Sequence, residues 1–532
     1  MKRQITTWVL LLSAVPVLAA GESGDPPPDP TTFEGGRAAV AAVRAQSPTS
    51  GRAKNVILFI GDGMGVTTVT AARIYQGQLR GESGEENQLA FEDFPHVALV
   101  KTYNTNQQTP DSAGTMTAIV TGSKTRAGVL SIDRKVARGD FAGVPGNELP
   151  TLLENAEERG VSTGIVTTTT VTHATPAALY AHSPDRAWES DDRLSDASRA
   201  AGFPDLARQM IELAAGNGIE VVLGGGRQHF LPKSSSDPES SNGGNRLDGR
   251  DLTAEWRSGR ENAVVVTTRD QLLGLDPART GPLLGLFEPG HMNYEEDRLR
   301  NPTGDPSLSE MTGVAISILE RNPRGYFLMV EAGRIDHAHH AGNARRALRD
   351  TIELSDAVQL AREATDPADT LIVVTADHSH VFTIAGYPTR GNDILGKVRT
   401  NDATGEPGAD FSLDAAGRPY TTLGYHNGPG ARSTVIEGDQ VGIHTTEDDA
   451  AARSRYRRRP DLSKIDTATL DFLQEAAVPF SYETHSGEDV AVYADGPGAE
   501  LFRGVQEQNY LYHAMTEALG WNRRSLVEPS PR

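Results

Sequence analysis

Short apolar runs alternate with amphipathic stretches along most of the chain. The runs are rich in Val, Ile and Leu, which is typical of strands covered on both faces. They lie at 56–60, 164–166, 220–223, 326–330, 371–374 and 490–493. Between them, apolar residues recur at helical spacing, as in 204–215, 308–320 and 341–361. This alternation predicts an α/β fold with a large, mostly parallel central sheet flanked by helices on both faces.

The region 386–480 breaks this pattern. It is rich in Gly, Pro, Arg and Asp and has few apolar runs, so we expect a small crown-like surface insertion. The insertion would divide a catalytic α/β core into residues 53–385 and 481–522. The sequence also predicts a leader with a short helix in 21–52 and a polar tail in 523–532.

The first twenty residues have the pattern of a signal peptide. Lys2 and Arg3 precede an apolar stretch, and Ala19 and Ala20 supply the small residues that a signal peptidase prefers. The alternative is a membrane anchor, but a spanning helix needs about 20 continuous apolar residues, and this stretch is shorter. We therefore expect cleavage of residues 1–20 and export to the periplasm or the medium, with no membrane anchor.

Net charge and cysteine content indicate which partners and which stabilising interactions to expect. The 532-residue chain has a formal net charge of -20, which disfavours nucleic acid and anionic membranes as partners. An acidic surface fits both a halotolerant protein and an ordinary acidic exported protein. The chain has no cysteine, so packing and bound metals, rather than disulfides, must stabilise it in an oxidising compartment.

Polar side chains follow several predicted strands. Asp62 comes after the first run, Glu331 after the fourth and Asp377 after the fifth. Ligands bind beyond the carboxyl ends of strands in open α/β sheets, so these side chains should converge. Asp336 and His340 are four residues apart and would share one face of a helical turn. A single such histidine is often a hydrogen-bonded loop residue, but imidazole and carboxylate groups together indicate a zinc site.

The segment 109–115 offers a nucleophile. Asp111 is a natural helix N-cap, which would place Ser112 where free N–H groups and the helix dipole favour a phosphoryl group. Capping alone would also explain this pair of residues. A serine is no nucleophile at neutral pH unless it is activated, and a neighbouring zinc ion could activate it.

These motifs, in this order, resemble the alkaline phosphatase family from about Asn55 to about Gly520. The most specific segments are 111–115, 171–176, 331–340, 375–380 and 483–489. Two further segments, 286–290 and 322–325, resemble the animal, placental-type branch. The resemblance implies an enzyme of broad specificity that hydrolyses phosphate monoesters through a phosphoserine on Ser112. It also implies two zinc ions, one magnesium ion and one calcium ion per subunit, and a homodimer.

The resemblance also assigns roles to individual residues. One zinc ion would be bound by Asp336, His340 and His485, and the other by Asp62, Asp377 and His378. Magnesium would be bound by Asp62, Thr175 and Glu331, with His173 in its water shell. His337 and His380 would lie next to the metal ligands without binding an ion. The phosphate would be clamped by Arg186, which Asp111 orients. Calcium would be bound by Glu239, the carbonyl of Phe287, Glu288 and Asp305.

Some features depart from the family or leave other functions open. Tyr482 stands where placental-type relatives carry a glutamate near the mouth of the site. The relatives' cysteines are absent, and 525–532 is too polar for a lipid-anchor signal. A phosphodiesterase or phosphoglycerate mutase of similar architecture is the alternative, whereas a sulfatase would need a Cys/Ser-x-Pro-x-Arg motif. A non-catalytic calcium- or phosphate-binding protein would need neither Ser112 nor the zinc ligands.

Overall fold

The computed structural model describes residues 51–237, 243–301, 304–414, 417–431 and 459–521. The predicted signal peptide, leader helix and polar tail, and the expected calcium ligand Glu239, lie outside the described residues.

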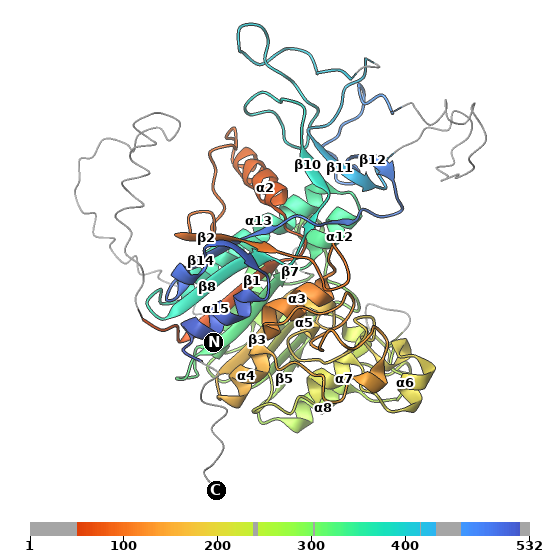
Figure 1. Ribbon diagram of the computed structural model, residues 1–532, viewed down its shortest axis with the longest axis vertical. Coiled ribbons are helices and arrows are strands. Elements are labelled where there is room, and N and C mark those ends of the chain that lie inside the picture. Colours follow the sequence, from red (N-terminus) through yellow and green to blue (C-terminus); the bar gives the residue numbers. More distant parts are fainter. Residues whose placement is uncertain (1–50, 238–242, 302–303, 415–416, 432–458, 522–532) are drawn as a thin grey trace, which may run out of the picture. The chain divides into compact units, whose positions relative to one another are not determined.

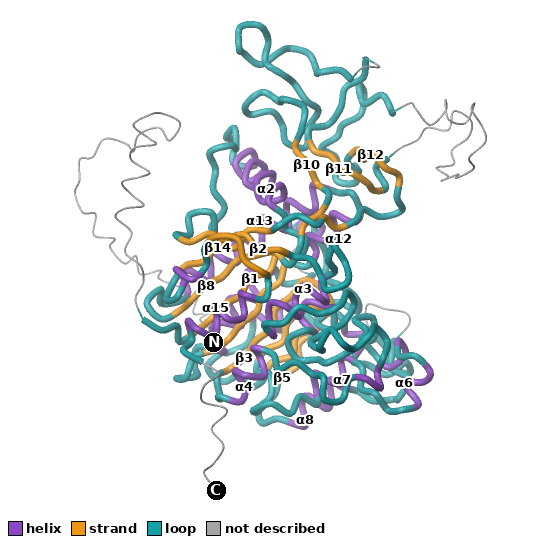
Figure 2. Tube along the Cα trace, in the orientation of Figure 1, coloured by secondary structure: helices purple, strands orange, loops and turns teal. Residues whose placement is uncertain are grey.

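A central sheet dominates the described part of the chain (Figures 1 and 2). In spatial order, its ten described strands are β15 (Gly504–Glu507), β2 (His96–Lys101), β14 (Val490–Asp495), β8 (Thr370–Ala376), β1 (Asn55–Gly61), β7 (Tyr326–Ala332), β3 (Ser162–Thr170), β4 (Val221–Gly225), β6 (Leu283–Leu286) and β5 (Val264–Val266). All pairs are parallel except those of β14 with β2 and β8. The predicted α/β fold class is confirmed.

The predicted apolar runs form the middle of this sheet. Every residue of β1, β3, β7 and β8 is buried, as expected for strands covered on both faces. The sequence pattern missed β2, β5, β6 and β15. In β2, exposed residues alternate with buried ones over the last five positions, and the other three strands have only three or four residues.

Two groups of helices flank the sheet. In one, α13 (Ala344–Ala364) packs against α2 (Val66–Leu79), α11 (Leu308–Leu319) and α12 (Arg334–His340). In the other, α3 (Ser112–Thr121) packs against α4 (Leu152–Glu158), α5 (Ala174–Ala177) and α15 (Tyr510–Ala518). The other α-helices among the described residues are α6 (Asp196–Ala200), α7 (Leu206–Ile211), α8 (Leu252–Gly259), α9 (Arg269–Leu273) and α10 (Glu295–Arg298). The described residues also form four short 3-10 helices: η1 (Phe141–Gly143), η2 (Asp191–Arg193), η3 (Arg227–His229) and η4 (Ala499–Leu501).

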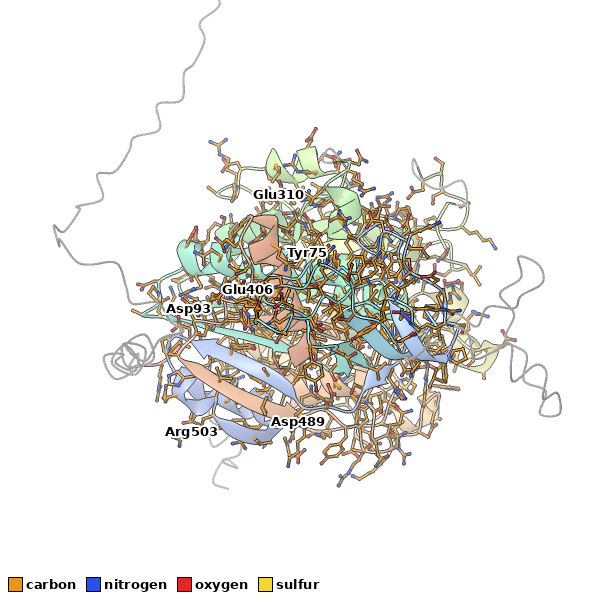
Figure 3. All side chains as sticks on the ribbon, turned by 90° about the horizontal axis from the view of Figure 1, so that it is seen from above. Tyr75, Asp93, Glu310, Glu406, Asp489 and Arg503 are labelled. Atoms are coloured by element: carbon orange, nitrogen blue, oxygen red, sulfur yellow. The ribbon has the colours of Figure 1, made fainter. Side chains whose placement is uncertain are left out.

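Side-chain caps set the starts of α11 and α13. Ser307 and Glu310 form a reciprocal capping box that begins α11. Arg269 donates to both oxygens of Glu310, which is labelled in Figure 3. Asn343 caps α13 by accepting from the amide of Arg346. The predicted helices 308–320 and 341–361 are therefore present, with boundaries shifted by a few residues.

The predicted insertion contributes to a separate small sheet. Its strands are β10 (Phe382–Ile384), β11 (Leu423–Gly428) and β12 (Glu475–Pro479). On either side of the insertion, β9 (Ser379–His380) pairs with β13 (His485–Ser486), and His380 lies opposite His485. The chain thus leaves the core beside one histidine of the predicted site and returns beside another.

Candidate metal centre

Three acids meet where the central strands end. Asp62 follows β1, Glu331 lies near the end of β7 and Asp377 follows β8, and these strands are neighbours in register. All three side chains have no exposed surface. Burial, together with the charges of Asp377 and Asp336, raises the pKa of Asp62 well above its usual range. A cation bound among these buried carboxylates would relieve their mutual repulsion.

Asp336, His340 and His485 form the first ligand group. His340 Nε2 lies 3.0 Å from His485 Nε2 and 3.3 Å from Asp336 Oδ1, and His485 Nε2 lies 3.2 Å from the same Asp336 oxygen. Ligand atoms arranged tetrahedrally around zinc are separated by about 3.3 Å. The three distances therefore match the edges of a zinc coordination tetrahedron.

The tautomers of the two histidines strengthen this interpretation. His340 Nδ1 lies 2.5 Å from the carbonyl oxygen of Glu483, and His485 Nδ1 lies 2.8 Å from that of Pro110. A carbonyl oxygen only accepts, so each Nδ1 carries the proton and donates. In the neutral ring, Nε2 then carries the lone pair, and in each histidine it faces the Nε2 of the other ring and Asp336 Oδ1. Three acceptors without a proton between them repel one another, and a cation removes that repulsion.

His380 and Glu483 hold Asp336 of this group in place. His380 lies between two carboxylates, 2.7 Å from Asp336 Oδ1 and 2.5 Å from Glu483 Oε2. Burial opposes its protonation, but the charges of Glu483 and Asp336 prevail and raise the pKa of His380 to about 10. His380 Nε2 thus holds Asp336, while Nδ1 is held by Glu483. Sequence reasoning assigned no role to Glu483, although it lies in the segment 483–489 that carried the family resemblance.

Asp62, Asp377 and His378 form the second group. His378 Nε2 is 3.4 Å from Asp62 Oδ1 and 3.4 Å from Asp377 Oδ2. The backbone amides of Gly63 and His378 hold the other oxygen of Asp377 at 3.1 and 2.8 Å. Gly63 has φ of 71°, and a Cβ there would lie 2.4 Å from the His380 ring, so only glycine fits after Asp62. Neither Asp62 oxygen accepts a hydrogen bond from any described residue.

A third group shares Asp62. Ligand atoms of Asp62, His173 and Glu331 lie within 4.8 Å of one another. Thr167 and Thr169 donate to Glu331 Oε2, and burial raises the pKa of Glu331 to about 7. Among the described residues, Glu331 Oε1, Thr175 Oγ1 and His173 Nδ1 are buried without a hydrogen-bonding partner. Oxygen-rich, unsatisfied groups of this kind fit magnesium and its water shell.

The predicted nucleophile adjoins the second group. Asp111 caps α3 by accepting from the amide of Gly114, and Ser112 is the first residue of the helix. Ser112 is 2% exposed, and its Oγ lies 3.2 Å from His378 Nε2. The serine hydroxyl therefore faces both the second group and the N-terminus of a buried helix, where an anion is favoured.

Arg186 contacts Asp111, the residue that precedes Ser112. Its guanidinium donates to Asp111 Oδ2 at 3.2 Å and to His173 Nε2 at 3.1 Å. Asp111 is held in turn by the amide of Gly128 and the side chain of Asn104. This fixes the guanidinium fork beside the nucleophile, the geometry needed to bind two phosphate oxygens. His337 accepts a hydrogen bond from Arg334 and lies against His173, with ring centroids 5.5 Å apart.

The three predicted calcium ligands that the structure describes lie together in a cavity that contains none of the residues of the three metal-binding groups. Phe287, Glu288 and Asp305 line a cavity of about 190 Å³. The Asn293 side chain bridges the two carboxylates, donating to Glu288 at 2.9 Å and to Asp305 at 3.0 Å. The structure thus brings together the three predicted ligands that it describes.

The fold and the centre together define an α/β enzyme whose site has three groups of side chains that could bind metal ions. Residues 53–521 match the family model for alkaline phosphatase. The tissue-nonspecific alkaline phosphatase of Gallus gallus is 47% identical over 491 residues, covering 91% of this chain and 88% of that protein. The alkaline phosphatase of Gadus morhua is 45% identical and covers 91% of this chain and 95% of its own length.

Solved structures agree with these matches. The alkaline phosphatase of Thermus thermophilus superposes with a TM-score of 0.61 at 26% identity, covering 90% of this chain and 94% of that one. The enzyme of the Antarctic bacterium TAB5 shows the same fold, with a TM-score of 0.57 at 22% identity over 89% of this chain and 99% of its own. The chain belongs to the alkaline phosphatase family, and it is a phosphoric monoester hydrolase.

Proposed function

We propose that this chain hydrolyses phosphate monoesters at a centre of two zinc ions and one magnesium ion, with Ser112 as the nucleophile. The observation that carries the proposal is the convergence of Asp336 Oδ1, His340 Nε2 and His485 Nε2 as three acceptors at 3.0–3.3 Å. The second zinc ion would be held by Asp62, Asp377 and His378. Magnesium would be held by Asp62, Thr175 and Glu331.

The residues themselves account for most of the reaction. Bound metal ions would lower the pKa of a hydroxyl group and neutralise charge on the attacking and leaving oxygens. Ser112 Oγ forms a bond to phosphorus as the bond to the leaving oxygen breaks, which gives phosphoserine and an alcohol. Arg186 binds two phosphate oxygens, and Asp111 keeps its guanidinium in place. Water then cleaves phosphoserine, and inorganic phosphate leaves with Ser112 restored.

Metal content measured alongside turnover tests this proposal. The purified protein should contain about two zinc ions and one magnesium ion per chain. Chelation should abolish hydrolysis of p-nitrophenyl phosphate, and zinc with magnesium should restore it. A metal-free protein with full turnover, or a diesterase activity above the monoesterase activity, would contradict the proposal.

We also propose a calcium site at Glu288, Asp305, the carbonyl of Phe287 and Glu239. It is supported by the proximity of the three described ligands and by the absence of histidine from the set, which favours a hard cation over zinc. This site lies in a cavity separate from Ser112. Bound calcium should therefore stabilise the fold without taking part in the reaction.

Export and a homodimer complete the proposed function. No helix in the described part of the chain is long and apolar enough to cross a membrane. An apolar surface supports the dimer: Val97 and Leu99 of β2 are 50% and 37% exposed, and Val505 of β15, which pairs with Leu99, is 54% exposed. Light scattering should give twice the chain mass, and Leu99→Glu with Val505→Glu should reduce it to the monomer mass.

A further inference from the structure

The position of the nucleophile determines where the leaving group lies. Ser112 Oγ lies against His378, in the second ligand group. In an in-line displacement the attacking and leaving oxygens are on opposite sides of phosphorus, and a two-metal site clamps one at each metal. With metal ions bound as proposed, the leaving oxygen would therefore lie at the first ligand group, which includes His340 and His485.

A row of rings leads from that group to solvent. The His378 and His485 rings stack with centroids 3.6 Å apart, and His485 stacks on His340 at 4.8 Å. The exposed fraction of these side chains rises from 0% at His378 to 14% at His485 and 28% at His340. The next ring is Tyr482, which meets His340 edge-on at 5.9 Å and is 57% exposed. Tyr482 therefore lies on the solvent side of the group that receives the leaving oxygen.

The backbone beside Tyr482 is rigidly attached to this site. The amide of Glu483 donates to the carbonyl oxygen of His340 at 2.8 Å, and the Glu483 carbonyl accepts from His340 Nδ1. The amide of Thr484 donates to Asn427 Oδ1 at 3.0 Å. The Tyr482 side chain makes no hydrogen bond with any described residue. An aromatic ring on a fixed backbone, half in solvent and beside the leaving group, is suited to stacking.

We propose that Tyr482 determines specificity by stacking against aromatic leaving groups, so that aryl phosphates are preferred over alkyl phosphates. The inference rests on the proposed function, because it takes Ser112 as nucleophile and the first ligand group as the acceptor of the leaving oxygen. An alkyl leaving group presents no ring and gains little from this contact. Inorganic phosphate has no leaving group and gains nothing.

Steady-state kinetics on the metal-loaded enzyme test the inference. The substrates are 2-naphthyl phosphate, phenyl phosphate and ethyl phosphate, and inorganic phosphate serves as a competitive inhibitor. Tyr482→Ala should lower kcat/KM for 2-naphthyl phosphate roughly two- to tenfold, through KM. It should leave ethyl phosphate turnover and the Ki of phosphate within a factor of two, and Tyr482→Phe should restore the aryl preference. Phe480→Ala removes a ring that is 44% exposed on the same segment and should change none of these values.

Two other kinetic results would contradict the stacking role of Tyr482. Equal losses for all three esters, or a raised Ki of phosphate, would show that Tyr482 supports the site as a whole and would overturn the inference. An unchanged aryl-to-alkyl ratio in Tyr482→Ala would overturn it as well. Labelling of Ser112 by phosphate in the same preparations keeps the two proposals separate. Label on Ser112 with an unchanged ratio rejects only the stacking role, whereas label elsewhere rejects the proposed function.

Discussion

A buried carboxyl group, Glu157, and its half-buried neighbour Glu220 should make the stability of this protein depend on pH. Glu157 of α4 is 1% exposed, and it accepts from Thr163 Oγ1 at 2.5 Å. Glu220 accepts from the amide of the same residue at 2.7 Å. Burial, and secondly the charge of Glu220, raise the pKa of Glu157 from 4.5 to about 7. The substitution Glu157→Gln removes this titration and changes the side-chain volume little.

The sign and size of the effect follow from linkage. Between pH 4.5 and 7, Glu157 is protonated in the folded protein and ionised in the unfolded chain, so the folded state binds one more proton. The free energy of unfolding therefore falls as pH rises through this window and is flat above it. The raised pKa of Glu157 corresponds to a decrease of about 3 kcal/mol in the free energy of unfolding. The unfolding entropy of a domain of this size is about 1 kcal/mol per kelvin, so this decrease lowers Tm by about 3 °C.

Scanning calorimetry at pH 5 and pH 8, with saturating metals, measures this difference. The Tm of wild type should fall between these pH values by about 3 °C more than the Tm of Glu157→Gln. Metal ligands titrate equally in both proteins, so their contribution cancels in the comparison. Glu158→Gln, an exposed neighbour on the same helix, should behave as wild type. Parallel pH profiles for wild type and Glu157→Gln would refute the reasoning.

Three further predictions concern the metals and the surface. Glu483→Gln removes the charge that holds His380, so zinc affinity at the first site should fall about 10- to 100-fold; an unchanged zinc titration would contradict this. Asp305→Ala should lower Tm and weaken calcium binding in calorimetric titration while most turnover at room temperature remains; calcium binding at wild-type affinity would count against the site. Sodium chloride up to about 1 M should raise Tm by screening the acidic surface; a flat or falling Tm would favour an ordinary acidic protein.

The central strands and the polar side chains that follow them could be predicted because their signals are local. Strands β1 and β8 are nearly continuous apolar runs, and a proposed metal ligand follows each directly, Asp62 after β1 and Asp377 after β8. Strand β2 gave no such signal, because its alternation of exposed and buried residues resembles a surface segment. Helix α7 ends at Ile211 although the apolar spacing runs to 215, and Gly216 and Gly218 with positive φ follow.

The supporting residues could not be derived from local pattern. Glu483 acts through His380, 103 positions away in the chain, and their contact exists only because β9 pairs with β13. The Nε2 lone pairs of His340 and His485 depend on the carbonyl oxygens of Glu483 and Pro110, which no side-chain motif records. The proposed stacking role of Tyr482 could not be derived from local pattern either, because it depends on the contact of its ring with the ring of His340.

The most direct test of the account is to trap the phosphoryl group on the enzyme. Wild-type protein mixed with labelled phosphate at acid pH and quenched should carry the label on Ser112. Ser112→Ala should carry none and should lose several orders of magnitude in turnover, with the metal content of wild type, because the nucleophile and not the metal centre is removed. Label on a different residue, or turnover near that of wild type in Ser112→Ala, would contradict the account.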